Sequence, residues 1–423
     1  MTRFTYILAA SPLHNEAGIR TMFDEYEPLL SRAGGTQRPK ASSKVTGPAP
    51  FYLILTGGTE AFVLESLKAL GLDGEAGRNH PLVLIAHGKH NSLPAALELA
   101  AWARQQGRAS LVVQLAGVDD PEGLGELDEA AKLAGCLYGM RKSRIGLVGE
   151  PSSWLVASRQ SPETVAASWG ASLLPIPFER LVKAMNAELK QGSKALPEAF
   201  VRDASFCREP SEEDMGKSEI ILRALKTLAA QERLDALSLR CFDLLSLNGS
   251  TGCYALARLA ADGIDAGCEG DVPSVLALRW MRLLSGKAAW MANPSVIRKG
   301  EGGKGRMLLA HCTVPLSLVP EYGIRSHFES GKGAALRGVL PQGPVTLLRI
   351  GGARLDTLWA TEGFLRESPA EEGLCRTQAV IELPNSDIDA LFAAPLGNHL
   401  VMVPGNWLRM IDRYVGWAGL TRV

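Results

Sequence analysis

The sequence predicts an α/β protein with parallel, doubly wound sheets in its first two thirds and an antiparallel sheet or barrel at its end. Over the first 150 residues, short apolar runs alternate with longer segments of helical spacing, which is typical of a parallel sheet covered on both faces. After about residue 290, strand-like runs are separated by Gly and Pro turns with little helical spacing between them, which is typical of antiparallel strands.

The first predicted domain, residues 1–143, is Rossmann-like. Its strands are expected at 6–10, 51–55, 82–86 and 110–115, and a further run at 144–148 opens the next domain. The second predicted domain, 144–289, is also Rossmann-like. Its other strands are expected at 172–176, 237–245 and 264–268, and its helices at 212–233, 251–261 and 275–284. The longest helix is the best supported, because Ser211 can cap it and acidic residues fill its first turn.

The third predicted domain, 290–423, contains the antiparallel strands. These are expected at 306–310, 345–350, 377–383 and 399–403, and a closing helix is expected at 407–415.

The composition of the 423-residue chain limits its partners. Lys plus Arg and Asp plus Glu both number 45, so no net basic charge is available to hold nucleic acid or an anionic membrane. No apolar run approaches the roughly 20 residues that span a bilayer. The seven scattered cysteines, none in a CxxC pair, fit free thiols in a reducing compartment. We therefore expect a cytoplasmic protein with a small-molecule partner.

Two carboxylates lie where a buried strand is expected to meet a buried helix. They are Glu269 and Asp271, in the segment Gly267-Cys268-Glu269-Gly270-Asp271. Burial of acids is costly unless they are paired or bind a cation, so we expect these two to have partners. As an alternative for Asp271, its side chain can cap the helix that begins near Val272.

Three histidines follow in the C-terminal region, namely His311, His327 and His399. A carboxylate and imidazoles drawn from separate strands are a normal ligand set for a hard or borderline divalent ion. Each histidine taken singly is more often a core or surface residue than a ligand. The metal-site hypothesis therefore depends on their combination with the acids.

Two loops after first-domain strands carry polar residues, Thr56-Gly57-Gly58-Thr59-Glu60 and His87-Gly88-Lys89-His90-Asn91-Ser92. Ligands bind at the carboxyl ends of strands in doubly wound sheets, so Thr56, His87 and Asn91 are candidate substrate-binding residues. The glycines match neither GxGxxG nor GxxxxGK[ST], so neither a dinucleotide site nor an ATP site is predicted. Tight turns without a ligand are the alternative.

Residues from about 237 to 407 resemble the L-fucose and L-arabinose isomerase superfamily. The resemblance is carried by Cys268-Glu269-Gly270-Asp271, Trp290-Met291-Ala292-Asn293-Pro294, Ala310-His311-Cys312 and Gly397-Asn398-His399. It implies two Rossmann-like domains followed by a β-barrel domain, and a catalytic Mn²⁺ (or Mg²⁺) bound by Glu269, His311 and His399. It also implies a homo-oligomer in which a neighbouring first domain completes the active site.

One position departs from the family pattern. Where that family has a second acid, this chain has Asn293, whose carbonyl oxygen can bind a metal ion but whose neutral amide cannot accept a proton. The hypothesis is then that Glu269 transfers the proton between neighbouring sugar carbons. Asp271 or Glu329 would replace the missing acid.

The expected reaction is metal-dependent isomerisation of an aldose to a ketose through an enediolate. Arg240 is a candidate contact for a sulfonate or phosphate substituent on a modified sugar. The alternatives are a sugar-binding module, a metal-dependent epimerase or lyase of a related carbonyl compound, and a catalytically altered homologue, which only Asn293 suggests.

Overall fold

The computed structural model describes residues 3–38, 45, 47–74, 77, 80–117, 119–190, 192 and 196–423. The chain divides into two compact units, each of which we describe by itself. The first comprises Met1–Gly139 and Asp412–Gly419, and the second comprises Met140–Ile411 and Leu420–Val423.

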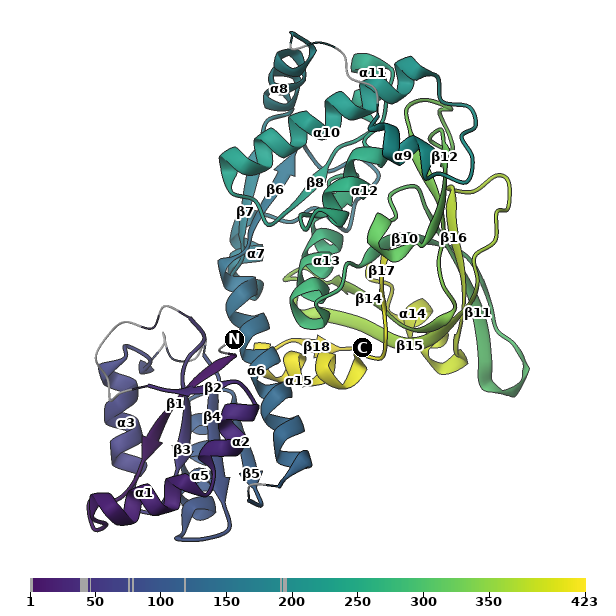
Figure 1. Ribbon diagram of the computed structural model, residues 1–423. Helices are drawn as coiled ribbons and strands as arrows, with labels where there is room; N and C mark the ends of the chain where they lie inside the picture. Colours follow the sequence, from purple (N-terminus) through teal and green to yellow (C-terminus); the bar gives the residue numbers. More distant parts are fainter. Residues whose placement is uncertain are drawn as a thin grey trace. The chain divides into compact units, whose positions relative to one another are not determined.

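The first unit contains a parallel sheet in the order β2-β1-β3-β4-β5 (Figure 1). Its strands are β1 (Phe4–Ala9), β2 (Gly35–Gln37), β3 (Phe51–Ile54), β4 (Leu82–His87) and β5 (Ser110–Leu115). Its helices are α1 (Glu16–Asp24), α2 (Glu27–Arg32), α3 (Glu60–Ala69), α5 (Ser92–Gln105) and α6 (Pro121–Lys142), the last of which continues into the second unit.

Alternate residues of the first-unit strands pack into two separate cores. Phe4 and Tyr6 of β1 belong to one hydrophobic cluster, whereas Ile7 and Ala9 of the same strand belong to the other. Because consecutive side chains of a strand point to opposite faces, this sheet buries apolar side chains on both faces. The first unit is therefore a Rossmann-like α/β structure.

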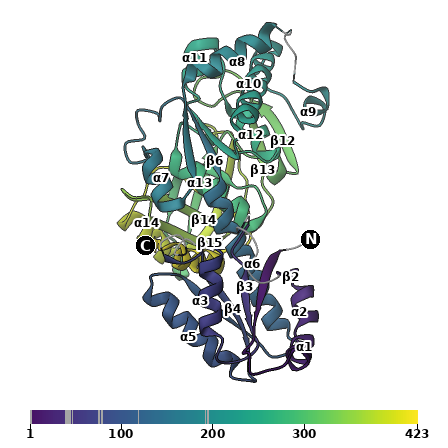
Figure 2. The same ribbon diagram turned by 90° about the vertical axis from the view of Figure 1, so that its left-hand side faces the viewer.

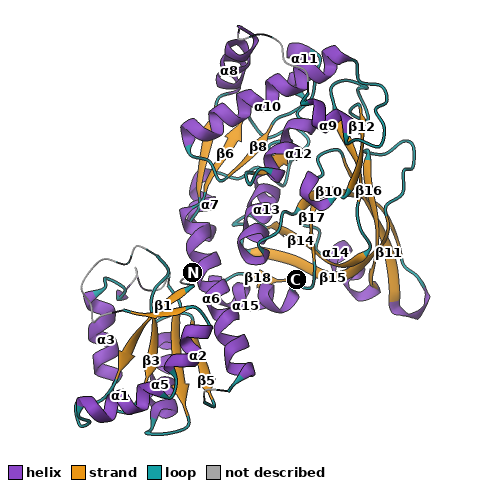
Figure 3. Ribbon diagram, viewed as in Figure 1, coloured by secondary structure: helices purple, strands orange, loops and turns teal. Residues whose placement is uncertain are grey.

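The second unit contains another parallel sheet, in the order β7-β6-β8-β9, of which Figure 3 labels β6 and β8. Its strands are β6 (Arg144–Val148), β7 (Ser172–Ile176), β8 (Ala236–Leu239) and β9 (Asp265–Cys268). The accompanying helices are α7 (Pro162–Trp169), α8 (Phe178–Lys190), α9 (Glu198–Arg202), α10 (Glu212–Glu232), α11 (Asp243–Asn248), α12 (Cys253–Ala261) and α13 (Val272–Ser285). A capping box of Ser211 and Asp214 begins α10.

The second unit also contains a closed antiparallel β-barrel. Its strands follow one another in the order β14-β17-β10-β11-β16-β15, and pairing of β15 with β14 closes the ring. They are β10 (Trp290–Arg298), β11 (Lys304–His311), β14 (Gly343–Gly351), β15 (Thr357–Glu367), β16 (Thr377–Pro384) and β17 (Leu400–Pro404). The remaining elements are β12 (Glu321–Arg325), β13 (Ala335–Val339), β18 (Thr421–Arg422), η1 (Glu301–Gly303), η2 (Leu316–Leu318), α14 (Asn385–Ala393) and α15 (Leu408–Ala418).

Helix α13 joins the parallel sheet of the second unit to the barrel. It contacts β8 and β9 of the sheet and β14 and β17 of the barrel, and Figure 2 shows it between β6 and β14. This dual contact explains why the sequence of α13 is apolar nearly all round, since most of its side chains are buried. The amino end of α13 is consequently fixed relative to both sheets.

The predicted fold class is confirmed, with parallel α/β sheets followed by an antiparallel barrel. The division into three domains stays a prediction, although the two parallel sheets lie within 1–143 and 144–289 and the barrel strands lie within 290–423. One predicted strand, 237–245, is wrong. The strand ends at Leu239, where its pairing with β6 and β9 ends, and the apolar residues that follow form α11.

The closing helix predicted at 407–415 is present as α15, but its residues from Asp412 onward belong to the first unit. There Arg413 Nη1 donates a hydrogen bond to Glu129 Oε2 of α6 at 2.6 Å. In the part of the chain that the structure describes, no helix combines the length and the apolar character needed to cross a membrane.

Candidate metal centre

The site begins where the chain turns from β9 into α13. Glu269 and Gly270 both have left-handed backbone conformations, with φ of 64° and 73°. Asp271 then caps α13, because its Oδ1 accepts a hydrogen bond from Ser274 N at 2.9 Å. A non-glycine residue at positive φ costs on the order of 1–3 kcal/mol, and such residues concentrate at functional sites. The turn places Glu269 at the carboxyl end of the sheet, where ligands bind in this fold.

The loop after β6 packs closely against this turn. A Cβ atom on Gly270 would lie 2.7 Å from Pro151 Cα, so no larger residue fits there without displacing the loop. Ser152 N donates a hydrogen bond to the carbonyl oxygen of Glu269 at 2.8 Å. The loop thereby holds Glu269 in its strained conformation.

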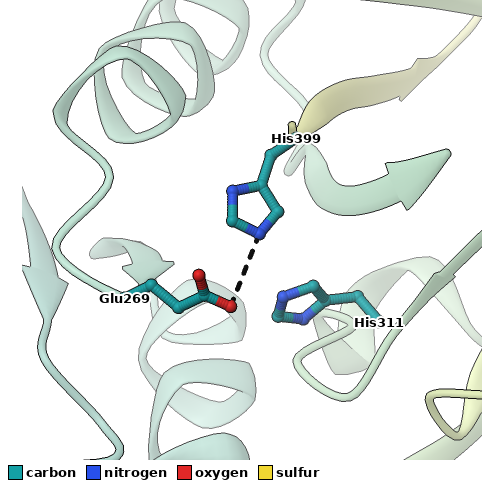
Figure 4. Close-up of side chains that lie close together, drawn as sticks. All are labelled: Glu269, His311 and His399. Atoms are coloured by element: carbon teal, nitrogen blue, oxygen red, sulfur yellow. Dashed lines mark ion pairs between the residues drawn. The ribbon is translucent and has the colours of Figure 1, made fainter. Parts of the chain in front are cut away.

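Two histidines from the barrel meet Glu269 (Figure 4). His311 is the last residue of β11, and His399 immediately precedes β17. One ligand atom from each of Glu269, His311 and His399, here called the ligand cluster, lies within 4.8 Å of the other two. Atoms bound at about 2.1 Å to one ion lie about 3–4 Å apart, so small adjustments bring the three onto a common cation.

Both histidines of the ligand cluster are oriented through their Nδ1 atoms. His399 Nδ1 donates a hydrogen bond to Asp271 Oδ2 at 2.8 Å, and His311 Nδ1 is hydrogen bonded to Thr313 Oγ1 at 2.9 Å. Partners of this kind fix the ring orientation of metal-bound histidines and raise their basicity. The Nε2 atoms are therefore the ones left to bind a ligand.

The Nε2 atom of His399 supports a metal ion most directly. His399 is fully buried, and this nitrogen has no hydrogen-bond partner. The nearby Glu269 Oε1 lies 3.6 Å away, beyond hydrogen-bond distance. A buried polar atom without a partner is costly, whereas a cation between this nitrogen and the carboxylate would satisfy both groups. The residues present therefore fit a divalent ion.

Burial and neighbouring charges set the protonation of the ligand cluster. Burial lowers the pKa of His399, but the hydrogen bond to Asp271 and the negative charges of Asp271 and Glu269 outweigh it and raise the pKa to about 9. Burial and the charge of His399 lower the pKa of His311 to about 4. Burial raises the pKa of Glu269, but His399 and the Trp154 N–H outweigh it and hold the pKa below its ordinary value. At pH 7 the metal-free site therefore combines an ionised Glu269, a neutral His311 and a protonated His399.

A buried arginine holds Asp271. Arg349 of β14 donates from Nη1 to Asp271 Oδ2 at 2.9 Å and to Ser274 Oγ at 2.6 Å, and from Nη2 to Ser158 Oγ at 2.6 Å. The side chains of Arg349 and Asp271 are 1% and 0% exposed. Burial raises the pKa of Asp271, but Arg349 and His399 outweigh it and hold the pKa well below its usual range. The carboxylate therefore stays ionised.

Three residues of this site, Trp154, Thr313 and Arg349, were not predicted from the sequence. Arg349 does carry a signal, because a charged residue inside the apolar run 345–350 requires a buried partner. Trp154 donates from Nε1 to Glu269 Oε2 at 2.6 Å, and the two residues are 115 positions apart, so no local pattern reveals the contact.

Three other predicted residues of the second unit lie outside the ligand cluster. Asn293 is half-buried on β10, opposite Ala310 of β11, and Glu329 is exposed on a turn. Arg240 lines a cavity at the carboxyl ends of β6, β7 and β8, and its Nε forms an ion pair with Asp243 at 3.0 Å. The roles assigned to Asn293, Glu329 and Arg240 stay predictions.

The remaining predicted residues belong to the first unit and lie at or after the carboxyl ends of its strands. Thr56 Oγ1 accepts a hydrogen bond from Ser11 N at 2.7 Å, and buried His87 Nε2 lies 3.1 Å from the carbonyl oxygen of Leu55. Asn91, with φ of 57°, precedes α5. The contacts of Thr56 and His87 fit tight turns as well as ligand binding, so their substrate role also stays a prediction.

Comparison with known proteins adds no relative: no protein-family model matches the chain, and no curated protein is significantly similar to it in sequence. The geometry of the site and the motifs that form it are therefore what indicates a function.

The affinity for Mn²⁺ should rise with pH between pH 6.5 and 8.5. His399, with a pKa of about 9, must lose its proton before Nε2 can bind a metal ion, whereas His311 and Glu269 already have no proton to lose. One proton released per ion corresponds to about a tenfold lower Kd per pH unit. Calorimetric titrations in two buffers of different ionisation enthalpy measure the Kd for Mn²⁺ and the number of protons released per ion. A Kd that does not change over this range would contradict the assignment.

Replacement of Arg349 by Met should destabilise the protein by about 3–5 kcal/mol, because it leaves the Asp271 carboxylate buried without its guanidinium. Urea denaturation measures the change. Arg354→Met is the matched control: Arg354 pairs with Asp356 at the surface and is 84% exposed, so its loss should cost no more than about 1 kcal/mol. An equal decrease in the free energy of unfolding in the two variants would show that the buried pair contributes no more to stability than the surface pair.

Proposed function

We propose that the protein is a divalent-metal-dependent aldose–ketose isomerase that acts through an enediolate. The observation that carries the proposal is the convergence of Glu269, His311 and His399, which lie at the ends of separate strands and belong to three of the four isomerase-like motifs. The hydrogen bond from His399 to Asp271 adds support, because a carboxylate behind a histidine is the usual partner of a metal ligand.

A bound divalent ion would stabilise the negative charge that develops on the carbonyl and hydroxyl oxygens of the sugar. We propose Mn²⁺, or else Mg²⁺, on the strength of the isomerase resemblance and of a ligand set without thiolates. Two imidazoles and one carboxylate also bind Zn²⁺ and Fe²⁺, so the identity of the metal ion is part of the test.

We propose Glu269 as the group that moves the proton between the two sugar carbons. Its carboxylate is ionised and 12% exposed, so a substrate can reach it. Asp271 is not accessible in this way: it is fully buried, and Ser274 N, Arg349 and His399 engage its two oxygens. We therefore assign Asp271 a positioning role instead of the catalytic role expected from the sequence.

A cavity of about 930 Å³ lies at the carboxyl ends of β6, β7 and β8, and the ligand cluster is not part of its lining. Its wall includes the loop that packs against Gly270. The charged residues of the lining are two arginines and three acids, namely Arg159, Arg240, Glu150, Glu179 and Asp243. Since the three acids outnumber the two arginines, this lining offers no excess positive charge to a sulfonate or a phosphate.

Metal analysis combined with a substrate screen tests the proposal. The Mn²⁺-loaded protein is incubated in D₂O with neutral aldoses, such as L-fucose and L-arabinose, and with sulfonated and phosphorylated aldoses. Proton NMR should show a ketose, with deuterium at the carbon that receives the proton. An inverted centre or a cleaved product would instead identify an epimerase or a lyase. Sugar binding without turnover would identify a sugar-binding protein or an altered homologue.

The Glu269→Gln variant should lower kcat on the sugar found in this screen by at least about 10²-fold, the usual contribution of a general acid–base group. Exposed Glu198 provides the matched control, and Glu198→Gln should keep the wild-type rate. Far-ultraviolet circular dichroism should confirm that both variants are folded. Unchanged turnover in Glu269→Gln would remove Glu269 from the mechanism.

A further inference from the structure

Trp154 is a half-exposed aromatic residue in direct contact with the ligand cluster. It lies in the loop after β6, and 50% of its surface is exposed. Its Nε1 donates a hydrogen bond to Glu269 Oε2 at 2.6 Å. The edge of its ring system meets Phe242, with the ring centroids 5.1 Å apart and an interplanar angle of 87°. The indole is therefore held in one orientation although half of it faces solvent.

The hydrogen bond from Trp154 distinguishes the two oxygens of Glu269. Oε2 is engaged by the indole, whereas Oε1 lies on the side of His399 Nε2. Ser152 N, in the same loop, donates to the main-chain oxygen of Glu269. One loop therefore holds both the main chain and the side chain of a residue whose backbone is strained.

The exposed part of Trp154 is apolar, because its only N–H group points to Glu269. Three other tryptophans of the described chain, Trp280, Trp290 and Trp359, are fully buried. Trp154 differs from them, because half of its surface is left free to contact a ligand. Aromatic side chains combine an apolar face with a fixed geometry and commonly line small-molecule sites. The C–H face of a sugar is the kind of surface that packs against such a ring.

We propose that Trp154 is the positioning residue of Glu269, directing Oε1 to the metal ion, and that its exposed ring forms the wall against which the apolar face of the sugar packs. The second half of this proposal rests on the proposed function. The first half concerns only the metal site and is tested without any sugar.

The first experiment compares Mn²⁺ affinities by calorimetry, with the metal salt alone as the probe. Trp154→Phe keeps an aromatic ring but removes the N–H donor, and it should raise the Kd for Mn²⁺ by about 10-fold, the lower end of what loss of such a partner costs. The control is Trp407→Phe, which removes another indole donor of the second unit, bonded to the carbonyl oxygen of Pro404 at 3.0 Å, and should leave the Kd unchanged. A wild-type Kd in Trp154→Phe would overturn the positioning role.

The second experiment measures binding of L-arabinitol and L-fucitol, two open-chain alditols, to the protein saturated with Mn²⁺. Trp154→Ala should bind them about 2- to 10-fold more weakly than Trp154→Phe, because only the alanine variant lacks the ring. The control is Phe392→Ala, which removes an exposed aromatic ring on α14 and should leave the affinity for the alditols unchanged. Equal affinities in the two Trp154 variants would overturn the sugar-packing role.

These two experiments separate failure of the inference from failure of the proposed function. If the wild-type protein binds neither alditol and isomerises no sugar, the isomerase proposal fails, while the Mn²⁺ result still decides the positioning role of Trp154. Because Trp154 is half-exposed, its replacement leaves no large internal cavity, and thermal melting should show all variants folded.

Discussion

The buried carboxylate of Asp271 is the interaction on which the site depends. It caps α13, pairs with Arg349 of the barrel strand β14 and accepts a hydrogen bond from His399. A buried guanidinium or a buried protonated imidazole would be costly alone, and so would the carboxylate. Together they satisfy one another, and a single acidic side chain joins the parallel sheet, the barrel and a histidine of the ligand cluster.

This arrangement explains how a strained residue can persist beside a well-ordered helix. Glu269 takes a left-handed conformation only two residues before Asp271, and the next residue must be glycine because Pro151 lies so close. Helix α13 is fixed by contacts with both sheets, so the turn that precedes it cannot relax without disturbing them. The strain thus directs Glu269 towards histidines that belong to the barrel.

Local sequence patterns identified the main candidates of the site for a physical reason. Acids at the junction of a buried strand and a buried helix need a compensating partner, and this requirement predicts that Glu269 and Asp271 have one. Both interpretations of Asp271, as a helix cap and as an acid with a charged partner, agree with the structure, because it caps α13 and pairs with Arg349. The contacts of Arg349 and Trp154 could not be predicted from local sequence patterns, because Arg349 is 78 residues from Asp271 and Trp154 is 115 residues from Glu269.

The sequence by itself determined the fold class, because the spacing of apolar residues reports which faces of each strand and helix are buried. It also determined which residue types were available to bind a metal ion. Only the tertiary structure decided where the strand beginning at Ala236 ends, which nitrogen of His399 is left for a ligand, and that Asp271 is enclosed and not free to react. These properties depend on burial and on charges brought together through space, and no stretch of neighbouring residues encodes them.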